Sequence, residues 1–433
     1  MIRRLRSLLS DGLIRTSGWL FAASMVSNVF AYGFQVAMGR LLTPAEYGFL
    51  NSLLAVFVVL SVPLATLPMV LAKRTAEYAA KNDFTRVRSL IGLAYRRIGL
   101  ACLLGLAAFA LGARFLADYL HSPSVVPVLI LGLCACSSFA VPINTAVLQG
   151  LQDYKWLGIT AGLGGPLKFF LCVGVVAAGF AVNGVLAGMV LTNLALWLIA
   201  YVPIRRHLLR GEDATGHVHQ LSFASVLPIF TANLAFAVLS QADMILVARY
   251  FPAHEAGMYA AAAILGRSVM YVPGAFVLAL FPMVSEHHSL NRDSRHLLLK
   301  ALGATLCISG FGAALFFLFP GFLIGTFFGA RYLEAAPVLR YFGLAMLPMA
   351  FLLVLMNYSI AKGEKRFSYL MALGAFLEIV FIYFHHESLL KVVFAIMAVG
   401  LFLIAIGSIK ALIAKPFEQD VEGRDRQARG AFS

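Results

Sequence analysis

The chain has 433 residues, of which 61% are hydrophobic and only 12% are charged. Soluble domains carry about 25% charged residues, so this composition excludes an ordinary soluble protein and predicts a membrane protein. The net charge of +14 does not indicate a nucleic-acid partner, because the basic residues are unevenly distributed among the loops. With a cytoplasmic N-terminus, 26 of the 34 Lys and Arg residues fall in cytoplasmic segments or at cytoplasmic span ends, which is the positive-inside bias of an inner-membrane protein.

Residues 1–16 mix basic and apolar positions and predict a short amphipathic helix at the inner interface. Twelve apolar stretches follow, each of about 20 residues and long enough to cross the bilayer as a helix. Their bounds are 17–38, 49–71, 90–112, 125–148, 156–180, 183–203, 222–247, 259–283, 298–319, 336–360, 367–385 and 392–413. A polar cytoplasmic linker, 204–221, separates an N-terminal six-helix bundle, 17–203, from a C-terminal one, 222–413. The charged tail, 414–433, is predicted to be disordered, and both termini are predicted to be cytoplasmic.

Parts of the first six spans recur in the last six. The loop motif from Arg40 to Gly48 returns between Arg249 and Gly257 with Arg, Glu and Gly at the same spacing. Two further pairs follow in the same order: Leu67-Pro-Met-Val70 with Phe281-Pro-Met-Val284, and Asn144 and Gly150 with Asn357 and Gly363. Because six spans separate the copies, both halves insert in the same orientation, which predicts a parallel internal repeat. The Glu in each loop copy is expected to cap the next helix or to pair with its Arg, and a gating role is the alternative.

Several motifs resemble those of one transporter family. They are apolar-Gly-Arg-Leu-Leu-Thr-Pro-Ala-Glu-Tyr-Gly (38–48), Pro68 with Lys73-Arg74, Gln149-Gly-Leu-Gln-Asp-Tyr154, Ala181-Val-Asn-Gly-Val-Leu-Ala-Gly188, Gln241-Ala-Asp-Met-Ile-Leu-Val-Ala-Arg249 and Glu255-Ala-Gly-Met-Tyr259. On these residues the chain is similar to the oligosaccharide flippase and polysaccharide transporter family of the multidrug/oligosaccharidyl-lipid/polysaccharide (MOP) superfamily. The resemblance implies an all-α integral membrane fold of about twelve helices, with two six-helix bundles around a V-shaped central cavity.

The resemblance also implies a function. The chain would be a flippase, not an enzyme, that moves undecaprenyl-diphosphate-linked oligosaccharide to the outer leaflet for surface polysaccharide biosynthesis, by alternating access of the two bundles. Its expected partners are membrane lipids, the polyprenyl-diphosphate-linked glycan, a polysaccharide polymerase and other assembly proteins. No cofactor is expected, although coupling to a cation or proton gradient is compatible with the family. Where the family often has a basic residue after the Asp of the seventh span, this chain has Met244, so Arg267 becomes the better candidate partner for Asp243.

Four ionisable residues lie within the predicted spans: Lys168, Asp243, Arg267 and Glu378. Such residues cost about 2.5–3.5 kcal/mol each on insertion scales and are functional candidates by default. Arg267 is a candidate ligand for the diphosphate, because a guanidinium can bind it bidentately. The alternative is a structural ion pair with Asp243, which the hairpin through Pro252 brings to a similar depth.

Lys168 follows the cluster Gly162-Leu-Gly-Gly-Pro166, which is expected to kink or unwind the fifth span. A kink with a cation would admit an anionic head group, and snorkelling or pairing with a carbonyl is the alternative. Glu378 lies near the middle of the eleventh span. It is a candidate for ion or proton coupling, with a neutral, hydrogen-bonded acid as the alternative.

Polar side chains follow one face of the first and seventh spans. Asn28, Tyr32 and Gln35 are spaced i, i+4 and i+7, and Asn233 and Gln241 are eight apart. In the resembled fold both helices face the cavity, so these five residues are candidate substrate-binding residues. Interhelical hydrogen bonds, worth about 0.6 kcal/mol on average in membranes, are the alternative. The five Cys lie in apolar spans and indicate packing, with neither a disulfide nor a metal site.

Three other functions are alternatives to the flippase. A multidrug or small-molecule antiporter of the same superfamily should have an excess of acidic cavity residues, and the two basic and two acidic residues within the spans do not decide the question. A peptidoglycan-precursor flippase usually has two additional spans. An embedded transferase or polymerase would need a large extramembrane loop, and the predicted loops are short.

Overall fold

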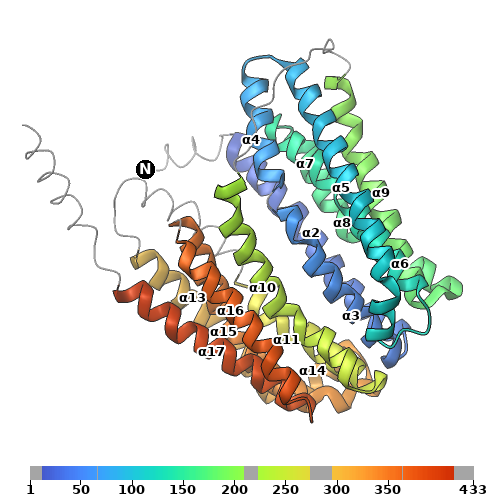
Figure 1. Ribbon diagram of the computed structural model, residues 1–433, viewed down its shortest axis with the longest axis vertical. Helices are drawn as coiled ribbons and strands as arrows, with labels where there is room; N and C mark the ends of the chain where they lie inside the picture. Colours follow the sequence, from blue (N-terminus) through green and yellow to red (C-terminus); the bar gives the residue numbers. More distant parts are fainter. Residues whose placement is uncertain (1–11, 66, 209–222, 274–294, 363, 414–433) are drawn as a thin grey trace, which may run out of the picture. The chain divides into compact units, whose positions relative to one another are not determined.

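The structure is a computed structural model that describes residues 12–65, 67–208, 223–273, 295–362 and 364–413. All regular secondary structure in this part of the chain is helical (Figure 1), which confirms the predicted all-α class. Most of the predicted interfacial helix, most of the linker and the tail lie outside the described residues. The motif Phe281-Pro-Met-Val284 also lies outside them.

The helices follow the predicted spans closely. The first half of the chain contains α2 (Gly12–Leu41), α3 (Pro44–Ser61), η1 (Val62–Ala65), α4 (Leu67–Ala80), α5 (Phe84–Tyr119), α6 (Val126–Ser138), α7 (Ala140–Gly150), α8 (Tyr154–Val175), η2 (Val176–Phe180) and α9 (Ala181–Leu208). The second half contains α10 (Phe223–Tyr250), α11 (Ala253–Tyr271), α13 (Arg295–Leu318), α14 (Pro320–Phe327), η3 (Ala330–Ala335), α15 (Ala336–Ala361), α16 (Lys365–Phe384) and α17 (Leu389–Ile413). Each predicted span is helical over most of its described residues. The second span comprises α3, η1 and α4, the fourth is interrupted at Phe139, and the fifth ends in the π-helical turn η2.

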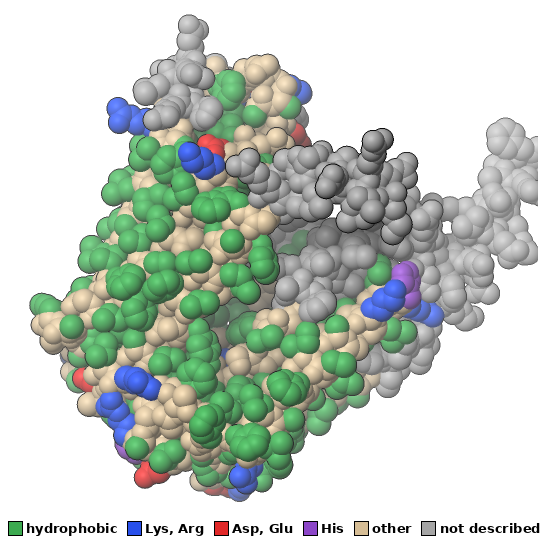
Figure 2. All heavy atoms as spheres, turned by 180° about the vertical axis from the view of Figure 1, so that it is seen from behind, with side chains coloured by type: hydrophobic (Ala, Val, Ile, Leu, Met, Phe, Trp, Pro, Cys, Tyr) green, Lys and Arg blue, Asp and Glu red, His purple; other side chains and the backbone are tan. Residues whose placement is uncertain are grey.

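Ten stretches of the described chain are long and apolar enough to cross a membrane. One of them, Tyr154–Arg205, contains both α8 and α9, and α11 is not among the ten. Apolar side chains cover much of the surface between charged side chains near its ends (Figure 2). Leu111 and Phe115, for example, expose 88% and 76% of their area. This surface is the one that a multi-pass membrane protein presents to lipid.

The chain divides into two compact units by its internal contacts. The first comprises Met1–Val226, Val247–Ala261 and Phe327–Ala330, and the second comprises Leu227–Leu246, Ala262–Thr326 and Arg331–Ser433. The first unit therefore includes the end of α10, the start of α11 and the residues around the end of α14. These short segments belong by sequence to the second copy of the repeat.

Short polar signals fix where helices begin in the first unit. The Thr43 hydroxyl accepts a hydrogen bond from the backbone N–H of Glu46, and the Glu46 carboxylate accepts from the backbone N–H of Thr43 at 2.9 Å. This capping box starts α3 at Pro44, several residues before the predicted span, and gives Glu46 the predicted capping role. Asp83 and Asp153 cap α5 and α8 in the same way, by accepting from the backbone N–H three residues later.

Glycines allow α2 and α8 to pack closely. Gly158, Gly162 and Gly165 share one face of α8, and a Cβ on Gly165 would lie 2.1 Å from the Ser27 carbonyl oxygen. The Gly165 backbone N–H donates to the Ser27 hydroxyl at 2.9 Å. Helix α8 is continuous from Tyr154 to Val175 with Pro166 inside it, so the expected unwinding does not occur. The glycine-rich cluster is a helix-packing surface instead.

Asn144, the asparagine of another repeat motif, is buried and belongs to a hydrogen-bonded triad with Tyr95 and Trp197. Tyr95 donates its hydroxyl proton to the Asn144 side-chain oxygen at 2.5 Å and accepts from the Trp197 indole at 2.8 Å. The Asn144 amide also donates to the Trp197 carbonyl. Its counterpart in the second copy, Asn357, donates to the Leu353 carbonyl of its own helix. The repeated asparagine is therefore part of the helix packing in the first copy.

Candidate transport site

A buried ion pair joins α10 and α11 in the second unit. Asp243 is 1% exposed and Arg267 is 6% exposed. One terminal nitrogen of the Arg267 guanidinium donates to both Asp243 carboxylate oxygens, at 2.6 and 2.8 Å. The guanidinium also lies over the Phe342 ring, 5.8 Å from its centroid. Of the two interpretations that the sequence left open for Arg267, this structure contains the ion pair, which uses one terminal nitrogen of the guanidinium.

A second carboxyl group lies close to this pair. Glu378 on α16 is fully buried, and neither of its carboxyl oxygens has a hydrogen-bond partner among the described residues. It is near enough to Asp243 and Arg267 to interact electrostatically with both. The Arg267 Nε is also without a hydrogen-bond partner in the described part. Burying a second, unpaired carboxylate costs several kcal/mol, so the geometry fits a Glu378 that carries a proton while Asp243 holds the guanidinium.

Lys168 on α8 is a cation that lies within the apolar spans of the first unit. Its ammonium lies 4.2 Å from the centroid of the Phe34 ring on α2, a favourable cation–π distance. Among the described residues it forms no ion pair and no hydrogen bond. The aromatic face satisfies part of the charge and leaves the ammonium donors available to an anion.

The polar stripe of α2 lies in the same unit as Lys168. Asn28 is exposed, and the half-buried Tyr32 ring meets Phe327 edge-to-face at 5.9 Å. The side-chain oxygen of Gln35 is buried and has no hydrogen-bond partner in the described chain. An interhelical hydrogen bond therefore does not account for this Gln35 oxygen.

The two predicted polar residues of α10 lie in the second unit. The Asn233 amide donates to the Ile229 carbonyl of its own helix at 2.9 Å, and Gln241 is buried with 8% of its area exposed. The structure thus brings Asp243, Arg267 and Glu378 together in one cluster. It places Lys168 and the α2 stripe in the other unit.

Both arginines of the repeated loop make contacts that the sequence did not predict. Arg40 donates through Nε to the Phe327 carbonyl at 2.9 Å. Arg249 lies 3.3 Å from the His121 ring nitrogen Nε2 and over the Tyr119 ring, 5.2 Å from its centroid. Tyr119 and Phe327 end α5 and α14 and are 208 residues apart, close to the 209-residue offset between the arginines. Each arginine therefore contacts the end of the helical segment that belongs to the other copy.

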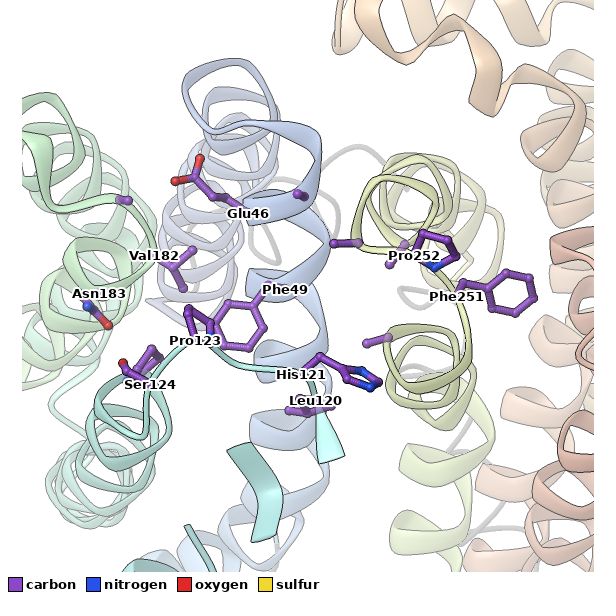
Figure 3. Close-up of a pocket in the computed structure, with 16 residues that line it drawn as sticks. Glu46, Phe49, Leu120, His121, Pro123, Ser124, Val182, Asn183, Phe251 and Pro252 are labelled. Carbon is purple, nitrogen blue, oxygen red and sulfur yellow. The ribbon is translucent and has the colours of Figure 1, made fainter. Parts of the chain in front are cut away.

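A cavity of about 560 Å³ lies beside these loops in the first unit. Phe49 and Pro123 both line it, and Glu46, Asn183 and His121 line it from three separate elements (Figure 3). The Glu46 carboxylate is already used to cap α3, and the labelled polar side chains do not converge on one point. The cavity is mainly apolar and carries no arrangement of catalytic groups among these residues.

Comparisons with known proteins agree with this architecture. The model of a family described as "Polysaccharide biosynthesis protein" matches residues 37–337, more than half of the chain. An uncharacterized membrane protein of Methanocaldococcus jannaschii is 21% identical over 388 residues, which cover 85% of this chain and 90% of that protein. The inward-facing structure of a multidrug resistance MATE family transporter of the MOP superfamily aligns with a TM-score of 0.70 and 12% identity, over 89% of this chain and 98% of that one. Lipid II flippase MurJ in an inward closed conformation aligns with a TM-score of 0.66 and 13% identity, over 92% and 88%.

These matches confirm the resemblance and the fold class predicted from the sequence. The long apolar helices of the described chain are those of a multi-pass membrane protein. At 12% and 13% identity the likeness to the solved structures concerns the fold, and the family follows from the match over residues 37–337. The chain belongs to the polysaccharide biosynthesis protein family.

Proposed function

We propose that this protein flips a polyprenyl-diphosphate-linked oligosaccharide from the inner to the outer leaflet of the cytoplasmic membrane, for surface polysaccharide biosynthesis. The family supports a glycan as the cargo. The observation that carries the proposal is Lys168, a cation within the apolar spans that has no anionic partner among the described residues. A diphosphate supplies the missing charge. Both termini are proposed to lie in the cytoplasm, where assembly enzymes deliver the substrate.

The transport cycle we propose is alternating access of the two bundles, residues 17–203 and 222–413. Lys168 contacts the diphosphate. Asn28, Tyr32 and Gln35 on α2, with Asn233 and Gln241 on α10, offer hydrogen bonds and aromatic faces to the sugars. Arg267 joins them as a ligand when its pair with Asp243 opens.

Replacement of Lys168 tests this assignment. In Lys168→Ala, outer-leaflet arrival of labelled lipid-linked glycan is expected to fall at least about tenfold, since a hydrogen bond to a charged group contributes about 1.5–3 kcal/mol. Lys168→Arg keeps the charge and should retain most transport. Lys155→Ala, at the exposed start of the same helix, is the matched control. Equal transport by Lys168→Ala and Lys155→Ala, at equal protein levels, would remove Lys168 from the site.

The cluster in the second unit is proposed to couple transport to protons or another cation. The cluster holds two carboxyl groups but only one guanidinium, which binds Asp243. If Glu378 loses its proton, the cluster carries one negative charge in excess, which attracts a cation or takes up a proton again. In Glu378→Gln this exchange is impossible. Transport by this variant should therefore lose its dependence on the ion gradient, measured in proteoliposomes with and without an imposed gradient. A dependence as steep as that of the parent chain would exclude Glu378 from coupling.

The excess of carboxyl groups in the same cluster also favours a second candidate, a multidrug or small-molecule antiporter. Such a protein would transport cationic dyes and would not move lipid-linked glycan. Dye transport and glycan transport, both measured with the purified protein in proteoliposomes, separate the two candidates.

A further inference from the structure

A narrow apolar groove of about 330 Å³ runs along the first unit between α5 and the pieces of the second and fourth spans. Leu60 and Pro63 line it from the α3–η1 segment, Cys102 and Leu106 from α5, and Cys136 and Phe139 from the α6–α7 segment. All the residues that line the groove are apolar, Gly or Cys.

Two interruptions of helix explain why the groove exists. Helix α3 ends at Ser61 and continues as the short 3-10 turn η1, and Phe139 separates α6 from α7. The long helix α5 is continuous past both interruptions. Opposite its Gly105 there is open space, because a Cβ there would meet no atom within 4 Å.

The groove has the length of one leaflet. Helix α5 lines it from Ile98 to Phe109, which at 1.5 Å per residue is about 16 Å. The hydrocarbon core of a bilayer is about 30 Å thick, so the groove covers about half of it. The predicted span 90–112 enters the membrane from the inner side, so the groove crosses the middle of the bilayer and its inner end is at Ile98.

A cation lies at the inner end of the groove. Arg97 precedes the lining residue Ala101 by four positions, so it belongs to the same face of α5 one turn further in. It is exposed and forms no ion pair among the described residues. Arg96, its neighbour, is also exposed but points about 100° away around the helix. Arg97 is thus aligned with the inner end of the groove.

We propose that this groove holds part of the polyprenyl chain of the lipid-linked substrate, with the diphosphate end of the chain at the inner end of the groove, near Arg97. The inference rests on the proposed function for the identity of the chain. A polyprenyl diphosphate suits this site because the apolar lining ends at a cation that forms no ion pair in the described part of the chain. Capture here presents the diphosphate end of the lipid to the first unit, which also contains Lys168.

The test is photocrosslinking of the full-length protein in nanodiscs with a polyprenyl diphosphate that carries a diazirine on its chain. Adducts are expected on α5 and α6 around the lining residues and should be competed by unlabelled polyprenyl diphosphate but not by excess phosphatidylglycerol. Gly105→Leu fills the groove and should abolish these adducts. Gly112→Leu, on the same helix and also facing open space, is the matched control and should keep them.

The head-group end is tested with a second matched pair. Arg97→Ala should weaken labelling by the diphosphate about fivefold, the contribution of one basic residue at a membrane surface, and leave labelling by the uncharged polyprenol unchanged. Arg96→Ala should affect neither probe. Unchanged adducts in Gly105→Leu, or equal competition by phosphatidylglycerol, would overturn the proposal and make the groove an ordinary lipid contact. Glycan transport without crosslinks in the groove would sink only this inference, whereas crosslinks in a protein that moves no lipid-linked glycan would sink only the proposed function.

Discussion

The buried cluster of Asp243, Arg267 and Glu378 contains two carboxyl groups in different environments. Asp243 holds both short contacts to Arg267, whereas Glu378 has no hydrogen-bond partner among the described residues. Breaking a buried pair by removing one partner leaves the other charge uncompensated. A buried neutral acid can be replaced by an amide of the same shape at little cost.

Substitutions at the two acids should therefore differ in stability. Asp243→Asn is expected to destabilise the protein by about 3–5 kcal/mol, because Arg267 stays buried without its anion. Glu378→Gln should stay close to the parent chain. The measurement is thermal unfolding in detergent followed by fluorescence-detected size exclusion. Equal midpoints for the two variants would contradict the assigned protonation states.

At the scale of the helix, the glycine stripe of α8 determines how closely α2 approaches it. Gly165 touches the backbone of Ser27, whereas Gly174, nine residues along the same helix, is exposed and faces open space. The two glycines therefore differ in tertiary contact while sharing the same helix.

Alanine at these two positions should change the stability of the protein differently. Gly165→Ala puts a methyl group 2.1 Å from the Ser27 carbonyl oxygen, and overpacking of this kind costs about 1–3 kcal/mol or more. Gly174→Ala should be neutral or stabilising by up to about 1 kcal/mol, the helix-propensity difference. Thermal midpoints of the two purified variants give the comparison. A Gly165→Ala protein as stable as the parent would exclude the close α2–α8 packing.

At the scale of the whole molecule, the proposed topology predicts the accessibility of its loops. Glu387 lies in the exposed loop between α16 and α17, which is predicted to be outside, and Lys81 lies in the turn after α4, which is predicted to be inside. A membrane-impermeant maleimide should label Glu387→Cys in intact cells. It should label Lys81→Cys only after permeabilisation, with the parent chain as background. The reverse pattern would invert the topology and the side from which the substrate enters.

The sequence predicts the helices well and their contacts less well. Long apolar runs determine the spans, because a membrane admits few alternatives. The spacing around Pro252 made the Asp243–Arg267 pair one of two open interpretations, which the sequence alone did not separate. The interruptions at Ser61 and Phe139 each precede a proline, Pro63 and Pro142, a local signal that the prediction of continuous spans passed over. The contacts of the two loop arginines could have been found only by aligning the helix ends of both copies.

The glycines of the duplicated loop determine how closely its two copies meet. A Cβ on Gly48 would lie 2.6 Å from the backbone nitrogen of Gly257, and one on Gly257 would lie 2.0 Å from the carbonyl oxygen of Pro44. A side chain at either position would force the two backbones apart, so each copy of the loop limits which residue the other can carry.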